Sequence, residues 1–148
     1  MNRKSTDFIL LRTMVIGIML MSGWAYTQTN TPEPETQVQV IKNITPEEAH
    51  VLIEKNKNNP NFAILDVRTP EEFAEGHIEN AATLDYYSES FRDDLNKLDK
   101  NKTYITHCRS GSRSGKTINM MKELGFKEAY NMLGGIVEWK EKGFPTIQ

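Results

Sequence analysis

Apolar residues along this chain fall into short runs separated by polar segments. The run Phe-Ala-Ile-Leu at residues 62–65 contains no polar position. Such a run is typical of a strand that helices cover on both faces of a parallel sheet. The runs that predict strands lie at residues 38–41, 62–65, 81–84, 103–106 and 129–133.

Helix signals occupy the segments between these runs. The sequence Thr-Pro-Glu-Glu occurs at 45–48 and again at 69–72. In each copy, threonine can cap a helix, proline suits its first turn, and the second glutamate completes a capping box. Apolar residues at helical spacing support the other helices. Helices are predicted from 45 to 55, 69 to 73, 88 to 98, about 113 to 124, and 136 to 142.

This alternation of strands and helices predicts an α/β fold with a mainly parallel central sheet flanked by helices. Residues 37–148 are enough for one domain with a modest core. Residues 26–36 are polar, contain two prolines, and are predicted to be a flexible linker.

The first 25 residues have a different character from the rest. A basic start is followed by an apolar run at 14–20 and then by small residues, which is the order found in a secretory signal peptide. The apolar run is short of the roughly 20 residues that span a bilayer. We therefore expect an exported protein, periplasmic or extracellular, with a cut after Ala25. The alternative is an uncleaved anchor at 8–24, the one case in which a membrane contact is expected.

Charge and cysteine content narrow the function. The chain has 18 basic and 20 acidic side chains. Removing Arg3, Lys4, Arg12 and Asp7 with the leader leaves 15 and 19, a net charge of −4. This acidic balance gives no indication of nucleic-acid binding. Cys108 is the only cysteine, so no intramolecular disulfide is available, and a lone cysteine is often an inert, buried small hydrophobe.

The surroundings of Cys108 favour a reactive cysteine instead. It follows a predicted strand and precedes a predicted helix, the place where ligands bind in open α/β sheets. A small-residue loop can present backbone N–H groups to an anion, and the positive end of the helix adds to this effect. Arg109 and Arg113 lie in the same loop. Together these features predict a thiolate whose pKa is lowered.

Several segments, taken in order, resemble the rhodanese family over most of residues 38–146. The resemblance implies a rhodanese-like fold and a sulfurtransferase that holds sulfur as a persulfide on Cys108. It implies a small anionic donor such as thiosulfate, a thiol or cyanide-like acceptor, and neither a cofactor nor a metal. The matching segments are LDVRTPEEF at 65–73, GHI at 76–78, NA at 80–81, CRSGSR at 108–113, GG at 134–135, Trp139 and GFP at 143–145.

The loop after Cys108 is the predicted substrate site, with Arg109 and Arg113 binding the anionic donor and the loop amides holding the persulfide. The predicted binding residues are Arg109, Ser110, Gly111, Ser112 and Arg113. Asp66, Arg68 and His77 are interpreted as structural support for nearby loops. His107 is expected to point to the opposite face of the sheet from Cys108.

Two other functions stay open. A domain with no second reactive group is compatible with a persulfide carrier, or a binding module for a partner protein, that has no turnover of its own. A cysteine phosphatase is disfavoured, because that signature places five residues between cysteine and arginine. Here four residues separate Cys108 from Arg113, and Ser114 occupies the position of the phosphatase arginine.

Overall fold

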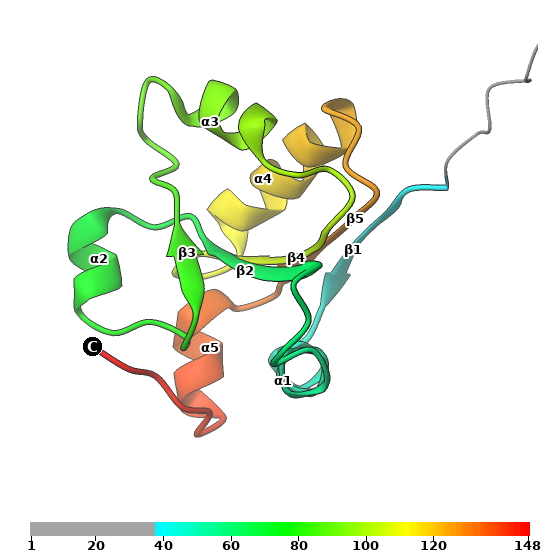
Figure 1. Ribbon diagram of the computed structural model, residues 1–148. Coiled ribbons are helices and arrows are strands. Elements are labelled where there is room, and N and C mark those ends of the chain that lie inside the picture. The colour runs from blue at the N-terminus through cyan, green and yellow to red at the C-terminus, as the bar shows by residue number, and fades with distance from the viewer. Residues whose placement is uncertain (1–37) are drawn as a thin grey trace, which may run out of the picture. The chain divides into compact units, whose positions relative to one another are not determined.

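The computed structural model describes residues 38–148 (Figure 1), which form an α/β fold around one sheet. The predictions of a signal peptide at 1–25 and a linker at 26–36 lie outside the described residues. The sheet order is β1-β5-β4-β2-β3, and every strand pair is parallel. The strands are β1 (Val40–Ile44), β2 (Phe62–Asp66), β3 (Ala81–Thr83), β4 (Thr103–His107) and β5 (Glu128–Met132).

Helices lie on both faces of the sheet. In Figure 1, α3 and α4 lie on one face, and α1 and α5 lie on the other. The predicted mainly parallel α/β architecture is therefore confirmed. Among residues 38–148, no helix is both long and apolar enough to cross a membrane. The helices are α1 (Pro46–Lys55), α2 (Pro70–Ala74), α3 (Phe91–Lys97), α4 (Ser112–Glu123) and α5 (Gly135–Glu141).

Both predicted capping boxes are present. The backbone N–H of Thr45 donates to Glu48 Oε2 at 2.9 Å, and Glu48 N–H donates to Thr45 Oγ1 at 3.3 Å. Thr69 and Glu72 repeat this reciprocal pair at the start of α2. Each box satisfies backbone N–H groups that have no partner inside the helix.

The bounds that differ most from the predictions are the end of β1 and the start of α3. Strand β1 extends to Ile44, because pairing with β5 continues through a polar stretch that the hydrophobic pattern alone does not include. Helix α3 begins at Phe91 instead of residue 88. Before it, Ser88 Oγ accepts from Ser90 N–H at 3.3 Å, so these serines form a local turn that competes with helix.

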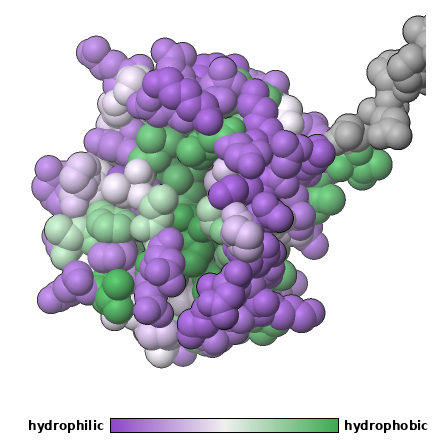
Figure 2. Space-filling view, in the orientation of Figure 1, coloured by the Kyte–Doolittle hydropathy of each residue, from purple (hydrophilic) through white to green (hydrophobic). Residues whose placement is uncertain are grey.

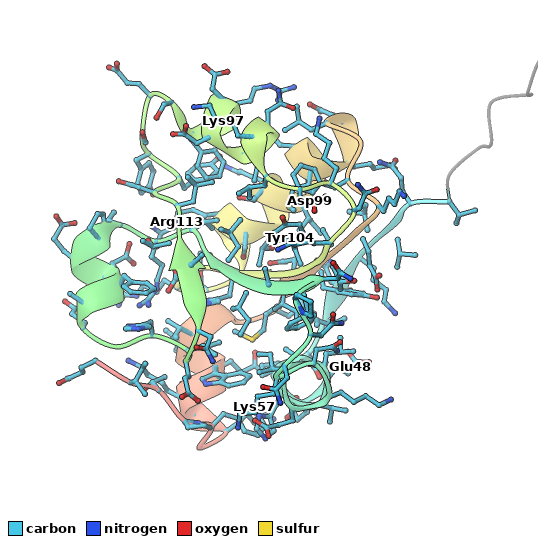
Figure 3. All side chains as sticks on the ribbon, in the orientation of Figure 1. Glu48, Lys57, Lys97, Asp99, Tyr104 and Arg113 are labelled. Carbon is cyan, nitrogen blue, oxygen red and sulfur yellow. The ribbon has the colours of Figure 1, made fainter. Side chains whose placement is uncertain are left out.

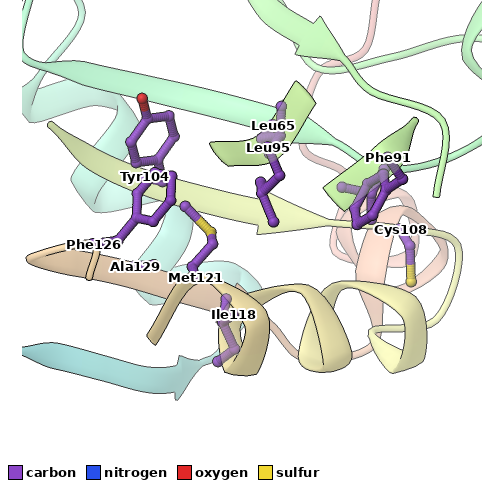
Figure 4. Close-up of a cluster of buried hydrophobic side chains, with 10 residues drawn as sticks. Leu65, Phe91, Leu95, Tyr104, Cys108, Ile118, Met121, Phe126 and Ala129 are labelled. Carbon is purple, nitrogen blue, oxygen red and sulfur yellow. The ribbon is translucent and has the colours of Figure 1, made fainter. Parts of the chain in front are cut away.

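The sheet separates two hydrophobic cores. Cys108 belongs to the core under α3 and α4, together with Phe91, Tyr104 and Met121 (Figure 4). The second core lies under α1 and α5 and includes Ile105 and Trp139. Figure 2 shows polar residues over most of one face, with apolar residues gathered towards its middle. Because the core fixes the carboxyl end of β4, it also fixes the position of Cys108.

Candidate functional site

The loop around Cys108 connects the end of β4 to the start of α4. Gly111 immediately precedes α4 with φ of +88°, a left-handed conformation that favours glycine. A Cβ atom at Gly111 would also lie 3.2 Å from the carbonyl oxygen of Met132. This glycine therefore allows the loop to turn sharply beside β5.

The Cys108 sulfur is buried and surrounded by hydrogen-bond donors. The residue is 1% exposed, Gly111 N–H donates to Sγ at 3.2 Å, and the Ser114 hydroxyl lies 3.5 Å from Sγ. Burial by itself raises the pKa of the Cys108 thiol. The Ser114 hydroxyl and the backbone N–H groups of Ser114, Ser110 and Arg113 outweigh burial, so the pKa is lowered. This is the direction that the sequence predicts.

The first residues of α5 hold the other side of the same loop. Ile136 N–H donates to the Cys108 carbonyl at 2.8 Å, and Val137 N–H donates to the Arg109 carbonyl at 3.2 Å. A Cβ atom at Gly135 would lie only 2.4 Å from the Cys108 carbonyl oxygen. Gly135 is therefore needed for α5 to approach the loop and bind these carbonyl groups.

Arg113 forms an ion pair that the sequence analysis did not predict. Its guanidinium forms two hydrogen bonds to the Glu72 carboxylate on α2, at 2.7 and 2.8 Å, and lies over the Tyr87 ring. Arg113 is labelled in Figure 3, on the side of the view that also shows α2. The guanidinium lowers the pKa of Glu72 to about 2, and Glu72 raises the pKa of Arg113. Arg113 is thus already paired with Glu72, and its predicted role in binding an anionic donor remains a prediction. The sequence showed Glu72 only as a capping residue.

Arg109 is left as the exposed cation of the loop. Within residues 38–148 it forms no ion pair, and it borders a surface pocket together with Arg68, Lys140 and Val137. Ser110 and Ser112 are also exposed at the loop. Their predicted role in substrate binding remains a prediction.

Asp66 and Arg68 form an ion pair beside the loop. Arg68 Nη2 lies 2.6 Å from Asp66 Oδ2, both side chains are almost fully buried, and Nη2 also donates to the Gly76 carbonyl at 2.9 Å. This network ties the end of β2 to the turn after α2. These contacts are those that a structural role would use, and the structural role of Asp66 and Arg68 remains a prediction.

His107 and His77 each contact residues outside the Cys108 loop. His107 is fully buried, its Nε2 lies 3.6 Å from Asp66 Oδ2, and burial lowers its pKa. It is therefore expected to be neutral. Its ring lies beside Asp66, whereas the Cys108 side chain packs in the core under α3 and α4. His77 stacks on Phe73 and its Nδ1 lies 3.2 Å from the Phe73 carbonyl, so its ring contacts α2.

The described residues contain no group of side chains arranged to bind a metal ion. Across residues 38–148, no three His, Cys, Asp or Glu side chains are grouped as metal ligands would be.

An apolar pocket between α1, β2 and α5 includes His50, Phe62 and Trp139. This pocket borders the core under α1 and α5, whereas the Cys108 side chain belongs to the core on the other face of the sheet.

Comparison with known proteins assigns the family. Residues 45–142 match the model of the rhodanese-like domain. The chain belongs to the rhodanese-like family. A sulfurtransferase of Allochromatium vinosum is 28% identical over 96 residues, which cover 65% of this chain and 88% of that protein. The family therefore supports sulfur transfer as the general chemistry of the domain.

Two longer proteins contain a region similar to this rhodanese-like chain. A probable adenylyltransferase/sulfurtransferase, MoeZ, of Mycobacterium tuberculosis is 30% identical over 104 residues, covering 70% of this chain and 26% of that protein. A tRNA uridine(34) hydroxylase of Yersinia pestis is 34% identical over 98 residues, covering 60% and 27%. The chain thus spans about a quarter of each.

Solved structures agree on the fold. The rhodanese-like domain protein of Staphylococcus aureus is 36% identical with a TM-score of 0.55, covering 66% of this chain and 90% of that one. A rhodanese-related protein of Thermoplasma volcanium is 26% identical with a TM-score of 0.60, covering 72% and 97%. These similarities confirm the rhodanese-like fold expected from the sequence.

The structure adds two residues to the rhodanese-like site. Ser114 lies against the Cys108 sulfur, although the sequence showed it only as a departure from the phosphatase signature. Asn131 on β5 contacts Ser114 Oγ through its side-chain amide at 2.6 Å. Sequence spacing gave no sign of Asn131, because β5 becomes a neighbour of β4 only through the sheet order.

Proposed function

We propose that this rhodanese-like protein transfers sulfane sulfur from an anionic donor such as thiosulfate to a nucleophilic acceptor through a Cys108 persulfide. The observation that carries this proposal is the buried sulfur of Cys108, which accepts backbone and hydroxyl hydrogen bonds that lower its pKa. A thiolate formed in this way is a nucleophile without a separate general base.

The first step is attack of the Cys108 thiolate on the outer sulfur of thiosulfate. A sulfur–sulfur bond to Cys108 forms, the sulfur–sulfur bond of thiosulfate breaks, and its electron pair leaves with sulfite. The negative charge moves to the outer sulfur of the persulfide. Exposed Arg109 is the cation proposed to bind the donor and the leaving sulfite.

The second step returns the thiolate. A nucleophile such as cyanide attacks the outer persulfide sulfur, takes it, and leaves the electron pair of the broken bond on Cys108. Because Cys108 is 1% exposed, a bulky acceptor has little access to Sγ itself. The outer sulfur, about 2.05 Å further along the chain of atoms, is the atom that the acceptor attacks.

Phosphate transfer receives less support from the same loop. Both arms of the Arg113 guanidinium already bind Glu72. They are therefore not available for the two parallel hydrogen bonds by which arginine recognises phosphate. Ser114, in the position of the phosphatase arginine, is buried against the sulfur.

The test is thiocyanate formation from thiosulfate and cyanide by the full chain, with Cys108→Ser as the control. We expect turnover in the wild type and none above background in the variant. Intact mass after thiosulfate alone should show a gain of one sulfur atom on the wild type only. A sulfur gain without turnover favours the carrier function, whereas no gain contradicts both functions. Cys108-dependent hydrolysis of an aryl phosphate would favour the phosphatase.

We also propose that the protein is exported, and that residues 1–25 are removed after Ala25. The support is the order of basic, apolar and small residues in the sequence. Intact mass of the protein from the producing cell, with its distribution between soluble and membrane fractions, tests this proposal. A full-length chain in the membrane fraction would favour the uncleaved anchor.

A further inference from the structure

Three polar side chains form a line from the surface to the reactive sulfur. Ser114 Oγ lies 3.5 Å from Cys108 Sγ, and the Ser114 hydroxyl donates to Asn131 Oδ1 at 2.6 Å. At the other end of the Asn131 amide, Nδ2 donates to Asn43 Oδ1 at 2.9 Å. Asn43 and Asn131 are paired in register across β1 and β5, so the sheet itself aligns the line.

The Ser114 hydroxyl has one proton for two acceptors. If it donates to Asn131 Oδ1, its lone pairs face the sulfur. That arrangement suits a thiol, whose S–H can donate to Ser114, but not a thiolate, which only accepts. A thiolate or persulfide anion at Cys108 requires the Ser114 proton to point at sulfur instead.

Asn131 can supply the compensating hydrogen bond. A half-turn of its side-chain amide exchanges the oxygen and the NH₂ group while keeping almost the same shape. The NH₂ group then donates to Ser114 Oγ, which releases the hydroxyl proton for the sulfur. The amide oxygen then faces Asn43, which must present its own NH₂ group.

The surroundings permit this exchange. Asn131 is 3% exposed, and Gly115 is the residue that leaves space for it, since a Cβ atom there would lie 3.3 Å from Nδ2. Asn43 is exposed and borders a surface cleft together with Gly111 and Asn131. The outer end of the line can therefore turn in contact with solvent.

We propose that Asn43, Asn131 and Ser114 form a reversible hydrogen-bond relay whose direction follows the charge on Cys108. With a thiol, each group donates outward, from sulfur towards Asn43. With a thiolate or persulfide anion, each group donates inward. Asn131 and Asn43 are positioning residues, because they act on the sulfur only through Ser114.

This inference rests on the proposed function for the presence of an anion at Cys108, but it concerns titration and not turnover. The readout is the pH profile of Cys108 thiolate, followed by ultraviolet absorbance and by the rate of alkylation in the full chain. A protein that fails to transfer sulfur can still show the relay, and a protein without the relay can still transfer sulfur. The two failures are therefore distinguishable.

The first experiment is a double-mutant cycle between Ser114→Ala and Asn131→Asp. Loss of the Ser114 donor should reduce the thiolate fraction about tenfold at a pH below the midpoint, as expected for a hydrogen bond to a charged group. A carboxylate at position 131 only accepts and holds the Ser114 proton. In that background, Ser114→Ala should change the thiolate fraction less than about twofold. An equal effect in both backgrounds would overturn the relay.

A second variant avoids the buried position. Asn43→Asp places an acceptor at the exposed end, which keeps the Asn131 NH₂ group turned outward and should decrease the thiolate fraction several-fold. Asn119→Asp is the matched control, because Asn119 is exposed and borders the same cleft. It introduces the same charge without a place in the relay. Equal decreases of the thiolate fraction in the two variants would show that the added charge alone causes the effect, and would refute the proposal.

Nuclear magnetic resonance gives an independent measurement on the wild type. The side-chain amide signals of Asn131 should shift with the same midpoint as the Cys108 thiol, and Cys108→Ser should remove that shift. Signals of Asn131 that stay constant through the Cys108 titration would contradict the relay. Circular dichroism of every variant confirms that folded proteins are compared.

Discussion

Replacing Glu72 by glutamine separates the two functions of this side chain. Glutamine still completes the capping box at the start of α2, where the Thr69 N–H donates to Glu72 Oε2 at 3.2 Å. It loses the charge that pairs with Arg113 at 2.7 and 2.8 Å. The variant therefore tests the ion pair between α2 and α4 without removing the helix cap.

The expected cost follows from the titration of Glu72. Its pKa falls from 4.5 to about 2 on folding, and this difference corresponds to about 3 kcal/mol at most. The Glu72 side chain is 26% exposed, so solvent screens the pair. We expect Glu72→Gln to lower the free energy of unfolding by about 1–2 kcal/mol at neutral pH.

The pH dependence fixes the sign of the effect. Because the pKa of Glu72 is lower in the folded protein, the pair stabilises the fold fully above pH 4.5. That stabilisation is lost as the pH falls from 4.5 towards the folded value of about 2. Wild type and variant should thus differ in urea unfolding at pH 7 and converge in acid.

Glu75→Gln is the control for this measurement. Glu75 is exposed near the end of the same helix and has no ion-pair partner among residues 38–148. Its replacement should change stability by less than about 0.5 kcal/mol. Equal stability losses for Glu72→Gln and Glu75→Gln, or a Glu72→Gln deficit that persists unchanged in acid, would refute the reasoning.

Three further changes have distinct expected results. Gly135→Ala places a Cβ atom 2.4 Å from the Cys108 carbonyl oxygen, so we expect loss of sulfur transfer and about 1–3 kcal/mol of destabilisation, measured by assay and urea unfolding. Arg109→Ala should raise KM for thiosulfate more than it lowers kcat, while Arg109→Lys should recover part of the loss; an unchanged KM would exclude Arg109 from donor binding. Asp66→Ala leaves Arg68 as a buried unpaired charge and should cost about 3–5 kcal/mol, and a melting temperature equal to the wild type would contradict this.

Local signals in the sequence predicted the elements that depend on neighbouring residues. The Thr-Pro-Glu-Glu segments predicted both capped helix starts, and an apolar run predicted β2, because caps and buried strands use residues close in the chain. The loop from Cys108 to Arg113 was found in the same way. The lowered pKa of Cys108 could also be predicted, since its main donors lie within six residues of it.

Contacts between distant segments were not predictable from spacing. Arg113 and Glu72 are 41 positions apart in the sequence. Spacing alone therefore gives no sign that the charge of Arg113 is paired with Glu72. Asn43 and Asn131 meet across 88 positions, and only the neighbouring places of β1 and β5 in the sheet bring them together. These contacts depend on sheet order and register, which the hydrophobic pattern of single strands does not encode.

Neutralisation of Arg113 changes which forces stabilise an anion at Cys108. With one loop arginine paired and Arg109 exposed to solvent, the groups nearest the sulfur are backbone N–H groups and the Ser114 hydroxyl. The backbone N–H groups are fixed dipoles, which stabilise negative charge without reorganising when the charge moves from the thiolate to the outer sulfur. They can therefore hold the charge first on the thiolate and then on the outer sulfur of a persulfide. A tightly paired cation at the sulfur would favour one of these positions over the other. A dipolar loop is thus better suited to a sulfur that must be both accepted and released.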